Sequence, residues 1–345
     1  MKKLLVLLFL LPCLAFSQGK YSKAGKRLFE QAGQAYASGN TTEAEYLFKE
    51  CLKQDYNCAE AHLNLSIINY HRGDFKMAMN YAQRAYNFNR FQPEIYEQLG
   101  KGYFRQGDYD SCVYFMEHAI EFGGDNQEIN LYLGQALMHT GDYNRSIELL
   151  TKVIEVSPNS SSAYSDRGSA YYNLGEYEKA QADFDKALSL NTGGAGIYLN
   201  LATIAMNNDS LDAAAKYLEK AELAANTNHE KVQVQILKGN QYLKSEDWDK
   251  AEESFNTAYQ FDNYDPVVLA NQAAVAIHQE NFQVAWEKCT AALEIDGENM
   301  AAYFNRGIAN EMLRKTADAC LDWEQAFILG SEQAEEYLNS PICSE

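Results

Sequence analysis

The sequence is short of basic residues and of proline. Its 345 residues include 29 Lys and Arg against 48 Asp and Glu, a formal net charge of −19 at pH 7, and only 5 Pro. A surface this acidic repels phosphate groups, so we expect neither nucleic acid nor an anionic membrane surface as a partner. The shortage of proline leaves long helices uninterrupted. After the first 17 residues no apolar run is long enough to cross a bilayer, so we expect no membrane insertion.

The motifs of common enzyme and metal sites are also missing. The six histidines are scattered, with no His-x3-His or Cys-x2-Cys spacing for zinc. The sequence contains no phosphate-binding glycine loop and no Gly-x-Ser-x-Gly elbow. Three carboxylates, Asp108, Asp110 and Asp142, fall at breaks between helical segments, where helix capping explains them. We therefore predict a protein that is not an enzyme and that uses no metal or cofactor.

The first 17 residues have the pattern of an export signal. Lys2 and Lys3 precede an apolar run, residues 4–11, and Ala15 and Ser17 occupy the −3 and −1 positions of a cleavage site. We therefore expect residues 1–17 to be a signal peptide and the mature protein to be exported, periplasmic or secreted.

Cys13 leaves a second interpretation open. A lipoprotein would be cleaved before this cysteine and lipidated on it, which would make the protein an outer-membrane-associated assembly factor. Pro12 argues against this alternative, because lipoprotein processing requires a small residue before the cysteine.

A 34-residue period, with one three-residue slip near His229, runs through the rest of the chain. Its clearest marks are four glycines, each followed two residues later by an aromatic residue: Gly73, Gly107, Gly141 and Gly175. Each period reads as two amphipathic helices separated at the glycine, where a helix C-terminus needs a positive φ. Repeats start near residues 25, 59, 93, 127, 161, 195, 232, 266 and 300. Residues 331–345 follow as a short capping helix and tail.

Two positions of every repeat hold small residues, which lets the helices of a pair approach closely. Position 8 holds Ala32, Ser66, Gly100, Gly134, Gly168, Ala202, Gly239, Ala273 and Gly307. Position 20 holds Ala44, Ala78, Cys112, Ser146, Ala180, Ala214, Ala251, Ala285 and Ala319. The pattern predicts an all-α protein of about nine helix pairs.

The pattern resembles the tetratricopeptide repeat (TPR). The residues that carry the resemblance include Tyr96, Leu99-Gly100, Tyr103, Gly107-Asp108-Tyr109 and Ala119. The resemblance covers roughly residues 25–330. It implies a right-handed α-solenoid over residues 18–330 whose first helices line a concave groove, and a function in binding a protein or peptide rather than in catalysis.

Donor side chains recur at position 13 of the repeats, a groove position in this family. They include His71, Arg105 and His139, and Lys101 at position 9 adds to them. These residues suit a docking strip for carboxylates. The alternative is that they offset the negative dipole end of each first helix.

Other groove positions are apolar, aromatic or amide-bearing. They include Leu63, Asn64, Ile67, Tyr70, Leu131 and Tyr172. Such residues suit a partner helix or an extended segment with apolar side chains, and some of them will be buried between first helices instead. The sequence therefore predicts an interaction scaffold.

Export would allow disulfides to form. Cys320 lies ten residues before Gly330 and Cys343 thirteen after it, so an antiparallel return of the capping helix brings them together. The segment around Cys320 also resembles a closing motif of exported bacterial TPR proteins. We predict a Cys320–Cys343 disulfide, with two free thiols as the alternative. A Cys51–Cys58 bridge is a weaker candidate.

Overall fold

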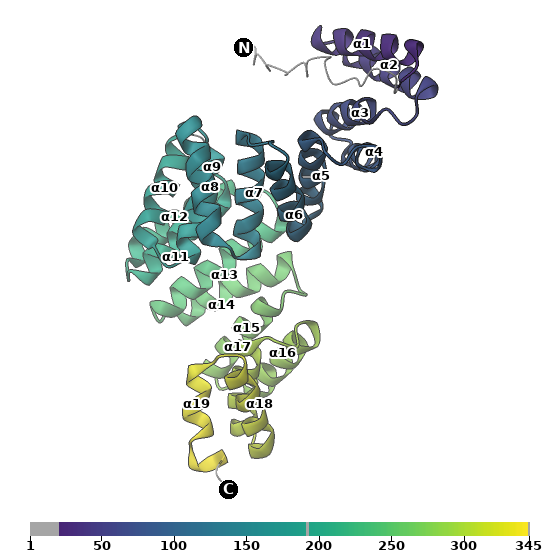
Figure 1. The fold of residues 1–345 in the computed structure, drawn as a ribbon. Helices are drawn as coiled ribbons and strands as arrows, with labels where there is room; N and C mark the ends of the chain where they lie inside the picture. The colour runs from purple at the N-terminus through teal and green to yellow at the C-terminus, as the bar shows by residue number, and fades with distance from the viewer. Residues whose placement is uncertain (1–20, 191–192, 344–345) are drawn as a thin grey trace. The chain divides into compact units, whose positions relative to one another are not determined.

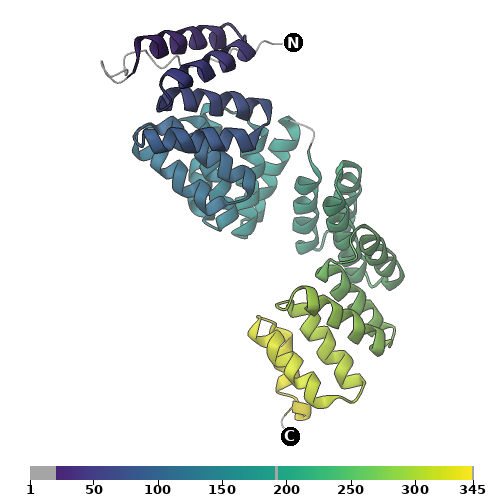
Figure 2. The same cartoon turned by 90° about the vertical axis from the view of Figure 1, so that its right-hand side faces the viewer.

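The computed structural model describes residues 21–190 and 193–343, and within these ranges the protein consists of helices without strands. The predicted signal peptide, with Cys13, lies outside the described residues. No helix in the described part of the chain is long and apolar enough to cross a membrane. The chain divides into two compact units, residues 1–183 and 184–345, and in both of them the helices stack in pairs (Figures 1 and 2).

The described residues of unit 1 form nine helices and the start of a tenth. They are α1 (Lys23–Ala37), α2 (Thr41–Gln54), α3 (Ala59–Arg72), α4 (Phe75–Phe88), α5 (Pro93–Gln106), α6 (Tyr109–Glu121), α7 (Gln127–Thr140), α8 (Tyr143–Val156), α9 (Ser161–Asn173) and α10 (Tyr177–Leu190), which ends in unit 2. Each odd-numbered helix up to α7 packs against the following helix, and α3, α5, α7 and α9 also contact one another in order.

Unit 2 continues the same arrangement. Its helices are α11 (Ala195–Asn207), α12 (Leu211–Ala224), α13 (Asn228–Lys244), α14 (Trp248–Phe261), α15 (Pro266–His278), α16 (Phe282–Ile295), α17 (Met300–Met312), α18 (Thr316–Ile328) and α19 (Glu332–Leu338), followed by the 3-10 turn η2 (Pro341–Cys343). Helix α13 starts four residues before the predicted repeat start at 232, because Thr227 and Glu230 form a capping box there.

The breaks between paired helices have the backbone that the glycines predict. Gly107 has φ 76° and closes α5, and Asp108 then caps α6 by accepting a hydrogen bond from the Ser111 amide at 3.0 Å. Asp142 caps α8 in the same way. Both carboxylates are therefore accounted for by capping, as predicted.

The small residues lie where the paired helices cross. A Cβ added to Gly239 would come within 2.3 Å of the Phe255 ring, and one added to Gly307 within 2.4 Å of Trp323. Ala44, Ala180 and the other position-20 residues are buried in the same crossings. The repeats thus carry a continuous series of small apolar clusters in place of one central core.

Helix α19 covers the last pair. Ala334 and Tyr337 pack on Trp323 and Ala326 of α18, and the Trp323 and Tyr337 rings lie 4.6 Å apart. Cys320 and Cys343 are joined by a disulfide with their Cα atoms 5.6 Å apart. Cys51 and Cys58 are free and buried.

Candidate functional site

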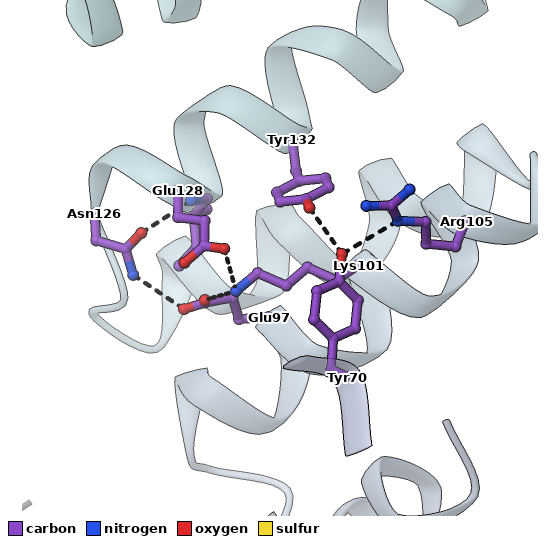
Figure 3. A network of polar contacts seen from close by, with 8 residues as sticks. Tyr70, Glu97, Lys101, Arg105, Asn126, Glu128 and Tyr132 are labelled. Carbon is purple, nitrogen blue, oxygen red and sulfur yellow. Dashed lines mark hydrogen bonds and ion pairs between the residues drawn. The ribbon is translucent and has the colours of Figure 1, made fainter. Parts of the chain in front are cut away.

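The predicted binding residues with the densest contacts lie on α3, α5 and α7, the consecutive first helices of unit 1. We call the surface that α3, α5, α7 and α9 form the first-helix face. Figure 3 shows its centre, where side chains from the three helices point toward one another.

Lys101 is the buried centre of this network. Only 4% of the residue is exposed, and its Nζ lies 2.5 Å from a Glu97 oxygen and 2.7 Å from a Glu128 oxygen. Burial alone would lower the pKa of Lys101, but the two carboxylates outweigh it and raise the pKa above its ordinary value. Asn126 donates to the second Glu97 oxygen at 3.0 Å. The charge of Lys101 is therefore matched by the protein's own carboxylates.

A tyrosine pair bridges two repeats above this lysine. The hydroxyls of Tyr70 on α3 and Tyr132 on α7 lie 2.8 Å apart, and both rings lie 5.9 Å from the Lys101 Nζ (Figure 3). Arg105 donates from Nε to the Tyr70 hydroxyl at 3.4 Å, and its guanidinium lies 4.9 Å from the Phe75 ring. Arg105 itself is exposed. The bridge holds α3 and α7 to one another across α5.

The structure only partly assembles the predicted docking strip of donor side chains. His71 is exposed at the end of α3. His139 stacks on Tyr109 at 4.0 Å, and burial lowers its pKa, so its ring is neutral at neutral pH. His71, Arg105 and His139 all lie in the last turn of their helices, where the dipole explanation also applies.

The other predicted contacts have mixed surroundings. Leu63 is buried against Ile95 and Leu99, and Ile67 packs on the same cluster. Leu131 packs against the cluster of α8 and α9. Asn64 donates to the Glu60 carbonyl of its own helix at 2.7 Å. Tyr172 is partly buried beside Tyr177, with ring centroids 5.7 Å apart.

Sequence reasoning missed Asp166 on α9. Its carboxylate accepts one hydrogen bond, from the Gln135 amide of α7 at 2.6 Å, and no cation lies within ion-pair distance in the described residues. Burial raises the pKa of Asp166 to about 6. The next residue, Arg167, turns away to Asp183, with N–O distances of 2.7 and 2.8 Å. Gln135 lies three residues after Tyr132, so Asp166 belongs to the same face. An acid at position 6, where four other repeats have Asn, was the available signal.

Stacked helix pairs with small residues at each crossing define an all-α solenoid. Sequence models of one repeat family match this chain: residues 29–93, 161–191 and 195–228 match models described as Tetratricopeptide repeat, and residues 134–175 one described as TPR repeat. The chain is a TPR solenoid and belongs to the tetratricopeptide-repeat family.

Similar curated proteins match only part of this chain. RNA polymerase II-associated protein 3 of Mus musculus is 30% identical over 124 residues, which is 36% of this chain and 19% of that protein. A DnaJ homolog subfamily C member 7 homolog of Dictyostelium discoideum is 30% identical over 101 residues, 28% of this chain and 19% of its own length. The chain thus spans about a fifth of these relatives.

Solved structures show the same fold. Cut9 bound to Hcn1, from the APC/C, is 15% identical with a TM-score of 0.55, covering 91% of this chain and 68% of that one. Pseudomonas aeruginosa pilF is 17% identical with a TM-score of 0.53, covering 61% and 96%. A tetratricopeptide repeat protein from Parabacteroides merdae is 16% identical with a TM-score of 0.50, covering 74% and 99%.

Proposed function

We propose that this protein is an exported scaffold that binds a segment of a partner protein on the first-helix face of unit 1 and that it has no catalytic activity. TPR repeats suggest a protein-binding role. The observation that carries the proposal is the network of Tyr70, Lys101, Arg105 and Tyr132, which presents tyrosine hydroxyls and an exposed guanidinium on one ordered surface. Because the network is already held in place by its own hydrogen bonds, binding a partner costs little further side-chain entropy on this surface.

The partner segment would meet Arg105 and the tyrosine hydroxyls first. Lys101 is buried beneath them, and its charge is already matched by Glu97 and Glu128. Of the two cations in this network, Arg105 is therefore the one that is exposed enough to meet an acceptor on the partner. A charge-assisted contact of this kind contributes about 1.5–3 kcal/mol.

A photo-crosslinking amino acid at position 105 tests the surface. We expect it to capture a partner in the producing cell, whereas the same amino acid at Lys76, an exposed residue of α4, does not. Arg105→Glu should then weaken co-purification of the captured partner, and Lys76→Glu should leave it unchanged. Equal capture from both positions would argue against a defined first-helix site.

Export is tested separately by the N-terminus of the mature protein. Mass spectrometry should find a chain that begins at Gln18. The alternative, an outer-membrane-associated assembly factor, is favoured by Cys13 and predicts a chain that begins at Cys13 and incorporates labelled palmitate.

A further inference from the structure

A cavity lies away from the first-helix face, between α2, α3 and α4 of unit 1. Its volume is about 440 Å³. Pockets that hold small organic molecules span roughly 300–1,000 Å³. The cavity is therefore large enough for a single-ring molecule.

Aromatic rings form its walls. The His62 ring stacks on Phe88 at 5.7 Å and lies 6.0 Å from the Tyr81 ring, and Tyr56 meets Phe88 edge-on at 5.6 Å. His62 is 4% exposed and donates from Nε2 to the Tyr56 carbonyl at 2.8 Å, which holds the α2–α3 connection in place. Burial lowers the pKa of His62, so the ring is a neutral aromatic wall at neutral pH.

Three cations also line this cavity, and no carboxylate does. Lys49 and Lys53 lie one turn apart on α2, and Arg84 comes from α4. The lysines pair with Glu45 and Glu50 at 2.6 and 2.5 Å, but the lysine side chains are 48% and 67% exposed, and ion pairs of exposed lysines contribute little. In the described residues no carboxylate lies within ion-pair distance of Arg84, whose guanidinium lies 5.9 Å from the Tyr81 ring. Three like charges around one cavity favour an anion.

The next repeat fills the corresponding space. The residues 34 positions after Leu52 and His62 are Tyr86 and Tyr96, whose rings pack edge-on at 5.4 Å. Tyr96 donates to the Arg90 carbonyl at 2.9 Å, the counterpart of the bond from His62 to Tyr56. The repeat therefore holds its connection equally with larger side chains at these two positions.

The next repeat differs in the charge of these side chains as well as in their size. The residues 34 positions after Lys49, Lys53 and Arg84 are Gln83, Asn87 and His118. The smaller side chains and the three cations thus occur around the same cavity. Packing does not require this combination, because the neighbouring pair is built without it.

We propose that this cavity binds a small aromatic acid. The flat ring packs against the aromatic walls, and the carboxylate or phosphate group meets Lys49, Lys53 and Arg84. In a protein of net charge −19, such an anion is recognised by local contacts, since the long-range field opposes its approach.

Phenyl phosphate is the probe, titrated into the full mature chain by ligand-observed NMR and calorimetry. Benzamide matches its ring without the charge, and inorganic phosphate matches the charge without the ring. We expect both to bind at least about tenfold more weakly than phenyl phosphate, as the loss of one recognition element implies. Binding of phenyl phosphate no tighter than either control overturns the proposal.

Variants locate the site. Arg84→Gln should weaken the binding of phenyl phosphate about tenfold. Lys76→Gln, the same charge change on α4 outside the cavity, should have no effect on binding. The double variant Leu52→Tyr, His62→Tyr copies the filled neighbouring repeat and should abolish binding with an unchanged circular dichroism spectrum. Full binding by the filled variant overturns the proposal. If that variant does not fold, the comparison of Arg84→Gln with Lys76→Gln decides, and equal affinities overturn it.

Discussion

Asp166 shows how far the surroundings of one residue alter its chemistry. It is a carboxylate on the first-helix face whose hydrogen-bond donor is the neutral amide of Gln135. Because burial raises its pKa to about 6, the folded protein holds a proton on Asp166 between pH 4 and 6 that the unfolded chain releases. The free energy of unfolding therefore falls as pH rises through this window, and the full loss of stability is reached above pH 6.

Asp166→Asn removes that cost and keeps an oxygen that accepts from Gln135. At pH 7.5 we expect the variant to be more stable than the wild type by about 1–3 kcal/mol in urea unfolding, with a smaller difference at pH 4. Asp110→Asn, at an exposed position of α6, is the control and should not gain stability at pH 7.5. A difference that does not change with pH would contradict the assigned cause.

At the scale of the helix, two glycines inside helices have opposite roles. Gly239 of α13 faces the Phe255 ring, whereas Gly33 of α1 has open space around its Cβ position. We expect Gly239→Ala to cost about 1–3 kcal/mol because the helices must move apart. Gly33→Ala should stabilise by about 0.5–1 kcal/mol through helix propensity. Thermal unfolding of both variants checks the difference, and equal melting temperatures would contradict it.

The end of the solenoid gives a second prediction for a structural element. The Cys320–Cys343 bridge spans a sequence separation of 23 and ties η2 to α18 beside α19. Replacing both cysteines by serine should cost about 3 kcal/mol through the entropy of the closed loop. Dithiothreitol should lower the melting temperature of the wild type and leave the double variant unchanged. Peptide mapping that finds both thiols alkylatable in the oxidised protein would count against the bridge.

For the whole molecule, stability is a sum over neighbouring repeats, because the clusters form between adjacent pairs and not around one core. Leu133→Ala in α7 removes a side chain that is 2% exposed and should cost about 2–4 kcal/mol locally. Hydrogen exchange should speed up in α5 to α9 and stay unchanged in α15 to α18. Uniform loss of protection along the chain would show that the repeats unfold as a single unit instead.

The sequence by itself determined the architecture of this protein. The 34-residue period, the glycines at Gly73 and Gly107 and the small residues at the helix crossings are local signals. The small residues recur in every repeat and the glycine in several of them. The predicted all-α fold and TPR family are confirmed for that reason. Tyr70, Lys101 and Arg105, chosen from the sequence as groove residues, lie beside one another in the structure, because the groove positions of the repeat recur on one face of the stacked first helices. That a partner binds them stays a prediction.

The tertiary structure alone decided what those neighbours do. Lys101, read from sequence as a docking cation, is matched by Glu97 and Glu128, and Tyr70 reaches Tyr132 across 62 residues. The cavity beside His62 likewise depends on which side chains of two adjacent repeats are smaller than their counterparts. A repeat period specifies where each Cα lies, but burial, ion pairing and the pKa depend on contacts between side chains of different repeats, and those contacts exist only once the helices have packed.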